Sequence, residues 1–424
     1  MATALMTATL AAGLGSVALP AQAGTVIPSI PRTNPVDWTP RVIDGAGASD
    51  AGVYELRQVG GTMYAGGRIR TVTGPSGSPT YSRMNIFAFD ATTGAVLNIP
   101  NLSANGDVYA IEPTPDGRYL YIGGDFGSFG GRSANNVVKF DLTTNTVVPG
   151  FAFPVATGRV SDLQLVGNRL FVAGNWNGGI VAVDPNTGAR TSYLNNVQVS
   201  GQTSDSQTTW TTRVYRFAVN PQQTRMVIIG SFTSVGGQAR RQVAMINLGS
   251  SSATVSPWYS TTWNRNCIRG MQWYTRDVDW SPDGSFFVVG NTGGAITNTF
   301  CDTATRWAPV DAPNQRPAWI QMTGGDTIHS VAVTDKAVFL GGHFRWLDNP
   351  EGRNTMGPGA ARAQGLGAID VNTGRAIRTW NPTKGLEGGR GAYDLYPTSA
   401  GLWVGHFEQR LGGELHPGLG LLPY

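Results

Sequence analysis

The feature that most constrains this chain is a short pattern that recurs along it. An apolar run is followed by one or two glycines, a polar residue and often an aromatic residue, most clearly as LYIGGDFGSFGG at residues 120–131. Similar stretches stand at residues 63–74, 227–237, 339–350 and 402–413. A pattern that returns at intervals of tens of residues indicates a repeat architecture, so the repeat unit is interpreted before any single motif.

Each unit is predicted to contain four antiparallel strands. An apolar strand opens the unit, and a tight turn such as TPDG at 114–117 leads into a second strand that ends at the repeated glycine. A third strand alternates apolar and polar residues, and a fourth carries an aromatic residue and a proline. The third strand often ends in an acid that is expected to cap the following turn, as at Asp90, Asp141, Asp184 and Asp370.

Seven such units, with no helical periodicity between them, predict one all-β domain, a seven-bladed β-propeller of four-stranded antiparallel blades. The last unit runs out before its fourth strand, and the residues around Trp38 resemble the strand at 379–389. The segment 36–45 is therefore expected to complete the last blade and close the ring, whereas an open solenoid would leave both ends uncapped. The predicted blades lie near residues 53–102, 107–155, 159–199, 212–260, 275–322, 326–385 and 391–424 plus 36–45.

Residues 1–23 have the composition of an export signal. They are small and apolar and end in Ala21-Gln22-Ala23, which fits the cleavage rule, and the single propeller domain would then span residues 24–424. No Lys or Arg precedes the apolar region, which departs from the usual pattern, and the alternative is an ordinary N-terminal helix. No other run reaches the roughly 18 apolar residues that cross a bilayer, so we expect a secreted, extracellular protein without a membrane span.

Charge and motifs narrow the function classes. The formal net charge is +4, and no basic cluster of the kind that nucleic-acid binding needs is present. The sequence lacks a Walker loop, a dinucleotide fingerprint, a nucleophile elbow and a zinc-ligand set, so neither a cofactor nor a metal is expected. In an exported monomer the two cysteines, Cys267 and Cys301, are expected to form a disulfide that joins two loops of one face.

Several units resemble a known repeat family. YIGGDFGSFGG…NNVVKFDLTTNTVVPGF and DTIHSVAVTDKAVFLGGHFRWLDNP are similar to the delta-60 repeats of secreted actinobacterial propeller proteins. The unit with DVDWSPDGSFFVV…CDTATRW is similar to the cysteine-bearing blade of that group. The resemblance extends over nearly the whole mature chain and implies a propeller and export. It implies no chemistry, because the family largely lacks an assigned reaction.

One face of the predicted propeller carries the candidate site. The start of the first strand and the end of the second lie together there, and both positions hold a different side chain from unit to unit. The positions that open the first strand are Tyr54, Tyr109, Ser161, Tyr215, Arg276, His329 and Tyr393. From these positions, their neighbours and those after the glycine, the expected ligand-binding residues are Glu55, Arg68, Asp125, Asn175, Asn291 and Asp394. The candidate catalytic residues gather in adjacent units and are Tyr54, His329, His343, Tyr393 and His406.

These residues predict a recognition module that binds a polysaccharide or another extracellular partner, glycan or protein. The first alternative is a carbohydrate-active enzyme, a polysaccharide lyase or a glycosidase. In such an enzyme one of the histidines would be the base, Tyr54 or Tyr393 the acid, and Arg68 the holder of a carboxylate. The second alternative is a structural cell-surface protein, in which the same polar residues link neighbouring blades. The fold does not choose among the three.

Overall fold

The computed structural model describes residues 24–43, 51–155, 158–204, 209–264, 267, 273–294, 300–382 and 391–424. Nearly all the regular structure in these residues is β, which confirms the all-β class. The helical elements among them are two short 3-10 turns, η1 (Asn195–Val197) and η2 (Thr262–Asn264). The predicted leader, residues 1–23, lies outside the described residues, as do residues 44 and 45 of the segment predicted to close the ring.

The long strands form a series of antiparallel sheets, and the strands of each sheet lie in chain order. The first sheet contains β2 (Gly52–Val59), β3 (Thr62–Arg68), β6 (Ile86–Asp90) and β7 (Val96–Leu97). The second contains β8 (Val108–Pro113), β9 (Tyr119–Gly124), β12 (Val137–Asp141) and β13 (Thr146–Val147). The third contains β14 (Val160–Val166), β15 (Arg169–Gly174) and β16 (Ile180–Val183). The fourth contains β20 (Arg213–Val219), β21 (Arg225–Ser231), β24 (Val243–Leu248) and β25 (Ala253–Val255).

The remaining sheets follow the same order. The fifth contains β26 (Thr275–Trp280), β27 (Phe287–Asn291), β28 (Thr303–Trp307) and β29 (Trp319–Met322). The sixth contains β30 (Ile328–Val333), β31 (Val338–Gly342) and β34 (Leu366–Ile369). The last contains β35 (Ala392–Thr398), β36 (Gly401–His406) and β39 (Leu419–Pro423).

Three sheets have three strands where four were predicted. In the third and sixth sheets the outer strand is reduced to single bridges, Val183 with Arg190 and Ile369 with Ala376. In these two sheets the chain returns beside the third strand for one residue pair only, so the outer edge is short. A short outer edge offers few unpaired backbone groups to other molecules.

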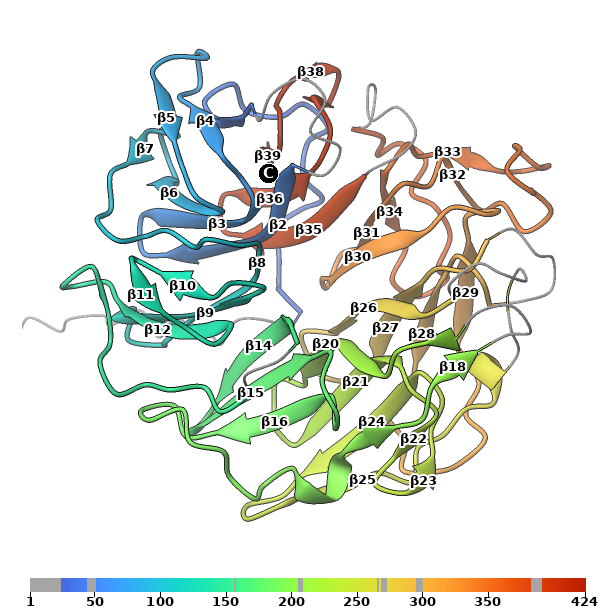
Figure 1. Cartoon of the computed structure of the whole chain (residues 1–424). Coiled ribbons are helices and arrows are strands. Elements are labelled where there is room, and N and C mark those ends of the chain that lie inside the picture. Colours follow the sequence, from blue (N-terminus) through green and yellow to red (C-terminus); the bar gives the residue numbers. More distant parts are fainter. Residues whose placement is uncertain are drawn as a thin grey trace, which may run out of the picture.

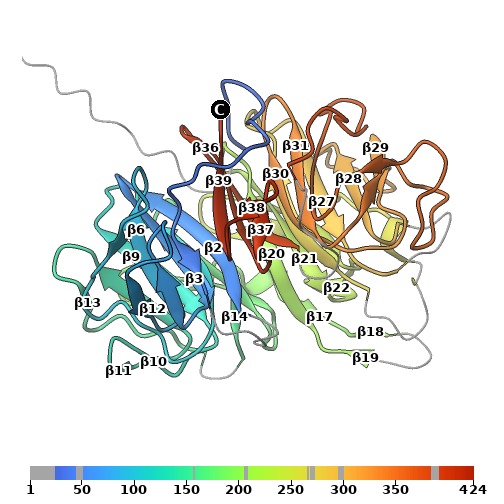
Figure 2. The same cartoon turned by 90° about the horizontal axis from the view of Figure 1, so that it is seen from above.

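Small hairpins extend several of the connections between second and third strands. They are formed by β4 (Thr71–Thr73) with β5 (Thr80–Ser82), β10 (Ser128–Phe129) with β11 (Arg132–Ser133), β22 (Ser234–Val235) with β23 (Gln238–Ala239), β32 (Trp346–Leu347) with β33 (Ala361–Arg362), and β37 (Arg410–Leu411) with β38 (Glu414–Leu415). Two further strands, β17 (Val199–Ser200) and β18 (Thr203–Ser204), pair with β22 and β19 (Thr209–Trp210). In side view β10, β11, β18 and β19 lie along one face (Figure 2).

The sheets are arranged around a common centre, with the first strand of each sheet innermost (Figure 1). Each inner strand contacts the inner strand of the next sheet along the chain, and β35 of the last sheet also contacts β2 of the first. Apolar clusters fill the space between neighbouring sheets, as where Trp403 and Leu421 pack with Val53 and Phe89. Packing between sheets therefore supplies the core and leaves the centre to polar residues of the inner strands.

The N-terminal segment contacts the last sheet earlier in the sequence than predicted. The backbone N–H groups of Arg32 and Val36 donate to the carbonyls of Pro423 and Leu421 on β39. Trp38 packs edge-on against Trp403, with ring centroids 5.9 Å apart. Beyond it, β1 (Arg41–Val42) pairs with β4 of the first sheet instead of β39. The backbone N–H of Val42 also donates to the carbonyl of Pro417, just before β39, so the described part of the predicted segment 36–45 does contact the last unit, although the contact begins earlier, at Arg32.

The predicted turn caps are confirmed. The Oδ1 atom of Asp90 accepts hydrogen bonds from the backbone N–H groups of Thr92 and Thr93, at 3.0 and 2.8 Å. The carboxylates of Asp141, Asp184 and Asp370 accept the equivalent bonds. These acids lower the energy of the local turn and take no part in the site described below.

Candidate functional site

Each inner strand contains a β-bulge near its start, and the bulge falls at the same place in every repeat. In the first sheet Val53 pairs with Gly67 and Glu55 pairs with Gly66, so that Tyr54 is the extra residue between them. The other inner strands show the same shift. A bulge re-aims the side chain that it carries. We call the bulged residues the mouth ring; they are Tyr54, Tyr109, Ser161, Tyr215, Arg276, His329 and Tyr393.

The mouth ring surrounds a cavity of about 340 Å³, which we call the mouth cavity. Every member of the ring lines it, together with Arg68, Arg159, Arg216 and Phe407. Small-ligand sites commonly start at about 300 Å³. The cavity therefore suits a compact ligand or the end of a chain.

One side of the mouth cavity is a continuous wall of rings. Tyr54 stacks on Tyr109 with centroids 5.1 Å apart and contacts Tyr393 edge-on at 6.0 Å. Tyr393 in turn stacks on His329 at 4.4 Å, with the two ring planes 16° apart. We call Tyr109, Tyr54, Tyr393 and His329 the aromatic wall. Such rings present apolar faces and polar edges to a ligand.

Four arginines bring positive charge to the mouth cavity. Arg68 donates to both carboxylate oxygens of Asp107, at 2.7–3.1 Å. Arg216 pairs with Glu55 at 3.2 Å and with Asp162 at 3.4 Å. Arg159 and Arg276 instead contact tyrosines. The cavity therefore contains two paired and two tyrosine-bound guanidinium groups.

Further along the inner strands lies a buried layer of charged residues around a small cavity of about 80 Å³. Thr25 of the N-terminal segment also lines this cavity. Glu55 connects the two arginines of the layer, because its oxygens contact both Arg57 and Arg216. We call the charged residues the ionic layer; they are Glu55, Arg57, Asp162, Arg216, Asp277, Asp279 and Asp394. Carboxyl groups outnumber guanidinium groups in it.

The carboxyl groups of the layer also link neighbouring sheets. Asp394 Oδ2 accepts a hydrogen bond of 2.6 Å from the backbone N–H of Leu56, and Asp162 Oδ2 accepts one of 2.8 Å from Phe217. Asp277 and Asp279 accept equivalent bonds from Val331 and Val333. Each inner strand is a sheet edge, so its outward N–H groups need such acceptors. The acids thus satisfy the backbone of the adjacent sheet.

Burial changes the protonation of these acids. Removal from water raises the pKa of Asp162 and of Asp394 to about 7, although the neighbouring arginines act in the opposite direction. Desolvation likewise raises the pKa of Asp277 to about 6 and that of Asp279 to about 8. Near neutral pH the layer is therefore partly protonated, which reduces its excess negative charge.

The structure brings part of the predicted catalytic group together. Tyr54, Tyr393 and His329 line the mouth cavity, and His343 meets His329 edge-on at 5.2 Å. Desolvation first, and then Arg276 and His343, hold the pKa of His329 well below its usual value. His329 is therefore neutral near neutral pH. Its ring is stacked face to face on Tyr393, so both groups act first as parts of a wall.

His406 lies elsewhere. It is fully buried, its Nδ1 accepts a hydrogen bond of 3.1 Å from the backbone N–H of Glu408, and burial lowers its pKa to about 3. It does not line the mouth cavity. His343 does not line the cavity either, but it contacts His329, whereas His406 lies apart from the cavity-lining candidates.

The predicted ligand-binding residues are divided among several places. Of them, Arg68 lines the mouth cavity, while Glu55 and Asp394 belong to the ionic layer. Asn291 is buried and bonds to Thr303, with its Oδ1 accepting from the backbone N–H at 2.9 Å. Asp125 and Asn175 do not line the cavity. Among the residues that follow the repeated glycine of each unit, Arg68 thus reaches the mouth cavity, because its side chain is long.

Two residues that line the mouth cavity, Arg159 and Phe407, were not predicted from the sequence. Arg159 stands two positions before the bulged Ser161, and Phe407 follows the last strand residue His406. Because alternate residues of an extended chain share a face, the residue two positions before each bulge was a predictable neighbour of the mouth ring. That signal was present in the sequence at Arg159.

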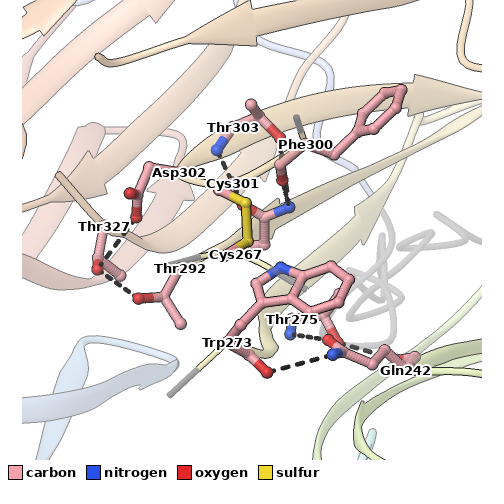
Figure 3. Close-up of a disulfide and its surroundings, with 11 residues drawn as sticks. Gln242, Cys267, Trp273, Thr275, Thr292, Phe300, Cys301, Asp302, Thr303 and Thr327 are labelled. Atoms are coloured by element: carbon pink, nitrogen blue, oxygen red, sulfur yellow. Dashed lines mark hydrogen bonds between the residues drawn. A yellow bond between two sulfur atoms is a disulfide. The ribbon is translucent and has the colours of Figure 1, made fainter. Parts of the chain in front are cut away.

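The two cysteines form a disulfide, with Cα atoms 5.8 Å apart. Both are buried, and Trp273 lies beside them (Figure 3). The surrounding hydrogen bonds connect three sheets, since Gln242 donates to the carbonyl of Trp273 and Thr292 bonds to Thr327. This part of the prediction is confirmed, and the disulfide joins the connection before β26 to the connection before β28.

In the ranges given above, no group of three or more His, Cys, Asp or Glu side chains is arranged to hold a metal ion. Among the same residues, no helix has the length and apolar character needed to cross a membrane.

Comparison with known proteins gives a likeness of fold. No family model and no curated protein sequence matches the chain. Among solved structures, one of U3-55K aligns over 92% of this chain and 100% of its own, with a TM-score of 0.50 and 12% identity. The crystal structure of the RRP9 WD40 repeats aligns over 92% and 98%, with a TM-score of 0.49 and 12% identity. The chain is thus an all-β repeat protein with a propeller-like fold.

Proposed function

We propose that this protein is an exported recognition module that binds an acidic glycan in the mouth cavity. The proposal includes a closed, seven-bladed ring, which is supported by the contact of β2 with β35 and by the bond from Leu56 to Asp394. A closed ring would hold the mouth residues of all blades at fixed distances from one another.

The observation that carries the proposal is the composition of the mouth ring. Its positions are structurally equivalent, yet they hold tyrosine, serine, arginine and histidine, and all of them line one cavity. The ionic layer shows what linkage between sheets requires, namely carboxylates that accept backbone N–H groups. The mouth ring instead lines the cavity with tyrosine and histidine rings and with Arg276. Of its members, Ser161 also links sheets, since its hydroxyl donates to the carbonyl of Val214 at 2.7 Å. Sugar rings pack on aromatic faces, and acidic substituents pair with guanidinium groups.

A glycan array gives the first test of this proposal. The purified protein is applied to uronate-bearing, sialylated, sulfated and neutral glycans and to acidic peptides. We expect binding to acidic glycans, and roughly tenfold weaker binding for Tyr54→Ala, because truncation of a central aromatic contact commonly has such an effect. Tyr81→Ala, on β5 and outside the mouth cavity, is the matched control. Melting temperatures of both variants show whether they fold.

Several outcomes separate the alternatives. Binding to acidic peptides alone, or to no glycan, would overturn the proposal. New absorbance from unsaturated products during incubation with uronate glycans would instead identify a lyase. Equal losses in Tyr54→Ala and Tyr81→Ala would place the binding surface outside the mouth cavity.

A further inference from the structure

Two arginines of the mouth cavity are held by tyrosines alone. Arg276 donates to the hydroxyl of Tyr274, and its guanidinium lies over the rings of Tyr274 and Tyr393, 5.3 and 5.8 Å from their centroids. Within the part of the chain that the structure describes, no carboxylate stands within ion-pair distance of Arg276. Its positive charge is therefore stabilised by dipoles and ring faces.

Arg159, which also lines the mouth cavity, is likewise in contact with a tyrosine. Its guanidinium lies 4.9 Å from the ring centroid of Tyr109, and Nη1 donates to the Tyr109 hydroxyl at 3.4 Å. By contrast, Arg68 and Arg216 are engaged by Asp107, Glu55 and Asp162. Arg159 and Arg276 thus carry charge that the described residues do not neutralise at contact distance.

Tyr215, a third residue of the mouth cavity, lies near both Arg159 and Arg276. It stacks on Tyr274 with centroids 4.2 Å apart, and Arg213 lies 4.7 Å from its ring centroid. Burial raises the pKa of Tyr215 to about 12, while Arg213, Arg276 and Arg159 all lie near enough to act against that rise. Three positively charged arginines, Arg159, Arg213 and Arg276, thus lie near Tyr215.

A half-buried cation without a counter-ion is costly, because the low dielectric of the cavity weakens its solvation. Arg159 and Arg276 both line the mouth cavity and are partly exposed in it. The aromatic wall occupies the other arc of the mouth ring, formed by its members from the sixth, seventh, first and second sheets. The arc with Arg159 and Arg276 thus suits an anionic group of a ligand, and the aromatic wall beside it suits a flat apolar face of the same ligand.

We propose that Arg159, Tyr215 and Arg276 form an anion subsite that takes the carboxylate of a terminal acidic sugar, while the sugar ring packs on the aromatic wall. This inference rests on the proposed function and specifies its ligand. A carboxylate is planar and accepts from two donors at once, which suits a cavity lined by two guanidinium groups and a tyrosine hydroxyl. Because Arg216 and Tyr393 line both cavities, the ionic layer lies directly beside the mouth cavity. A compact chain end fits this space better than the middle of a chain.

Isothermal titration calorimetry tests the subsite directly. The probes are a uronate-terminated oligosaccharide from the array, the same oligosaccharide after reduction of its carboxyl group, and its counterpart with a terminal sulfate ester. For Arg276→Gln and for Arg159→Gln we expect binding of the uronate probe to weaken by about tenfold or more, the usual effect of losing a charge-assisted hydrogen bond. Binding of the reduced probe should change by less than about twofold.

Arg118→Gln is the matched control. Arg118 is a mostly exposed arginine that also lies over a tyrosine ring and near a carboxylate, Asp141, but outside the mouth cavity. Unchanged binding of the uronate probe by Arg276→Gln and Arg159→Gln would overturn the subsite and leave glycan recognition intact. A stronger effect on the sulfated probe than on the uronate probe would overturn the assignment to a carboxylate. Failure of the wild-type protein to bind any of the probes would overturn the proposed function itself.

Discussion

At the scale of single residues, adjacent positions of one strand have separate roles. Tyr54 is bulged and faces the mouth cavity, whereas Glu55, the next residue, is buried in the ionic layer and contacts two arginines. Ser161 and Asp162 are divided between the two cavities in the same way, whereas Tyr393 lines both of them beside Asp394. At Tyr54 and Glu55 a difference of one residue thus decides whether a polar side chain lines the mouth cavity or the ionic layer.

The ionic layer has a neighbour whose protonation offers a measurement. Glu112 on β8 accepts a hydrogen bond of 2.8 Å from the backbone N–H of Leu165, and desolvation raises its pKa to about 8. In the unfolded chain this carboxyl is already ionised above about pH 5. Between about pH 5 and about pH 8 the native state therefore binds one more proton than the unfolded state, so the free energy of unfolding falls as the pH rises across this range and levels off above it.

We expect Glu112→Gln to reduce the loss of stability between pH 7 and 9, because the amide stays neutral. Each such group contributes at most about 1.4 kcal/mol per pH unit. The four histidines have lowered pKa values and affect the slope mainly below about pH 6.5, so they do not obscure this window. Urea unfolding at pH 7, 8 and 9, followed by tryptophan fluorescence, measures the effect. Slopes equal to those of wild type and of the exposed control Glu351→Gln would contradict the assignment.

At the scale of the strand, the bulge and the repeated glycine depend on each other. A Cβ atom on Gly67 would lie 2.0 Å from the carbonyl oxygen of Gly52, and one on Gly230 would lie 2.1 Å from that of Arg213. Equivalent contacts limit Gly124, Gly174 and Gly342. The second strand therefore needs glycine where the backbone just before the bulge approaches it. The repeated glycine in the sequence therefore marks the place on the second strand that faces the bulged part of the first strand.

Replacing one of these glycines should destabilise the protein strongly. For Gly230→Ala we expect a loss of about 3 kcal/mol in the free energy of unfolding, at the upper end of overpacking effects, because the obstacle is backbone. Gly61→Ala places its methyl group in open space and should change stability by less than about 0.5 kcal/mol. Chemical denaturation of the two variants compares them. Similar stability of both would show that the inner strands are not held as closely as described.

The local elements were the most predictable part of the molecule. The turn acids, the repeated glycines and the strand alternation are determined by neighbouring residues, so each unit could be located from the sequence. The outer strands of the third and sixth sheets depend on tertiary contacts and were overestimated. The position of the N-terminal segment beside β39 also depends on long-range packing, and the additional contact at Arg32, before the predicted range 36–45, was not foreseen.

At the scale of the whole molecule, the site is formed by residues that are distant in sequence and meet at the centre. The sequence showed that Tyr54, His329 and Tyr393 stand at equivalent positions, and the arrangement of sheets explains why they meet. It did not show that His406 turns away, because the position after the glycine reaches the cavity only with a long side chain such as Arg68. The sequence could predict where a residue stands along a strand, but the direction in which its side chain points could be seen only in the packed structure.

The most direct test of the central claim is a crystal structure of the protein with a uronate-terminated oligosaccharide. We expect the sugar carboxylate to lie between the guanidinium groups of Arg159 and Arg276, near the hydroxyl of Tyr215, with the sugar ring against Tyr54 or Tyr393. An oligosaccharide bound on the outer edges of the sheets, with the mouth cavity left open to solvent, would contradict it.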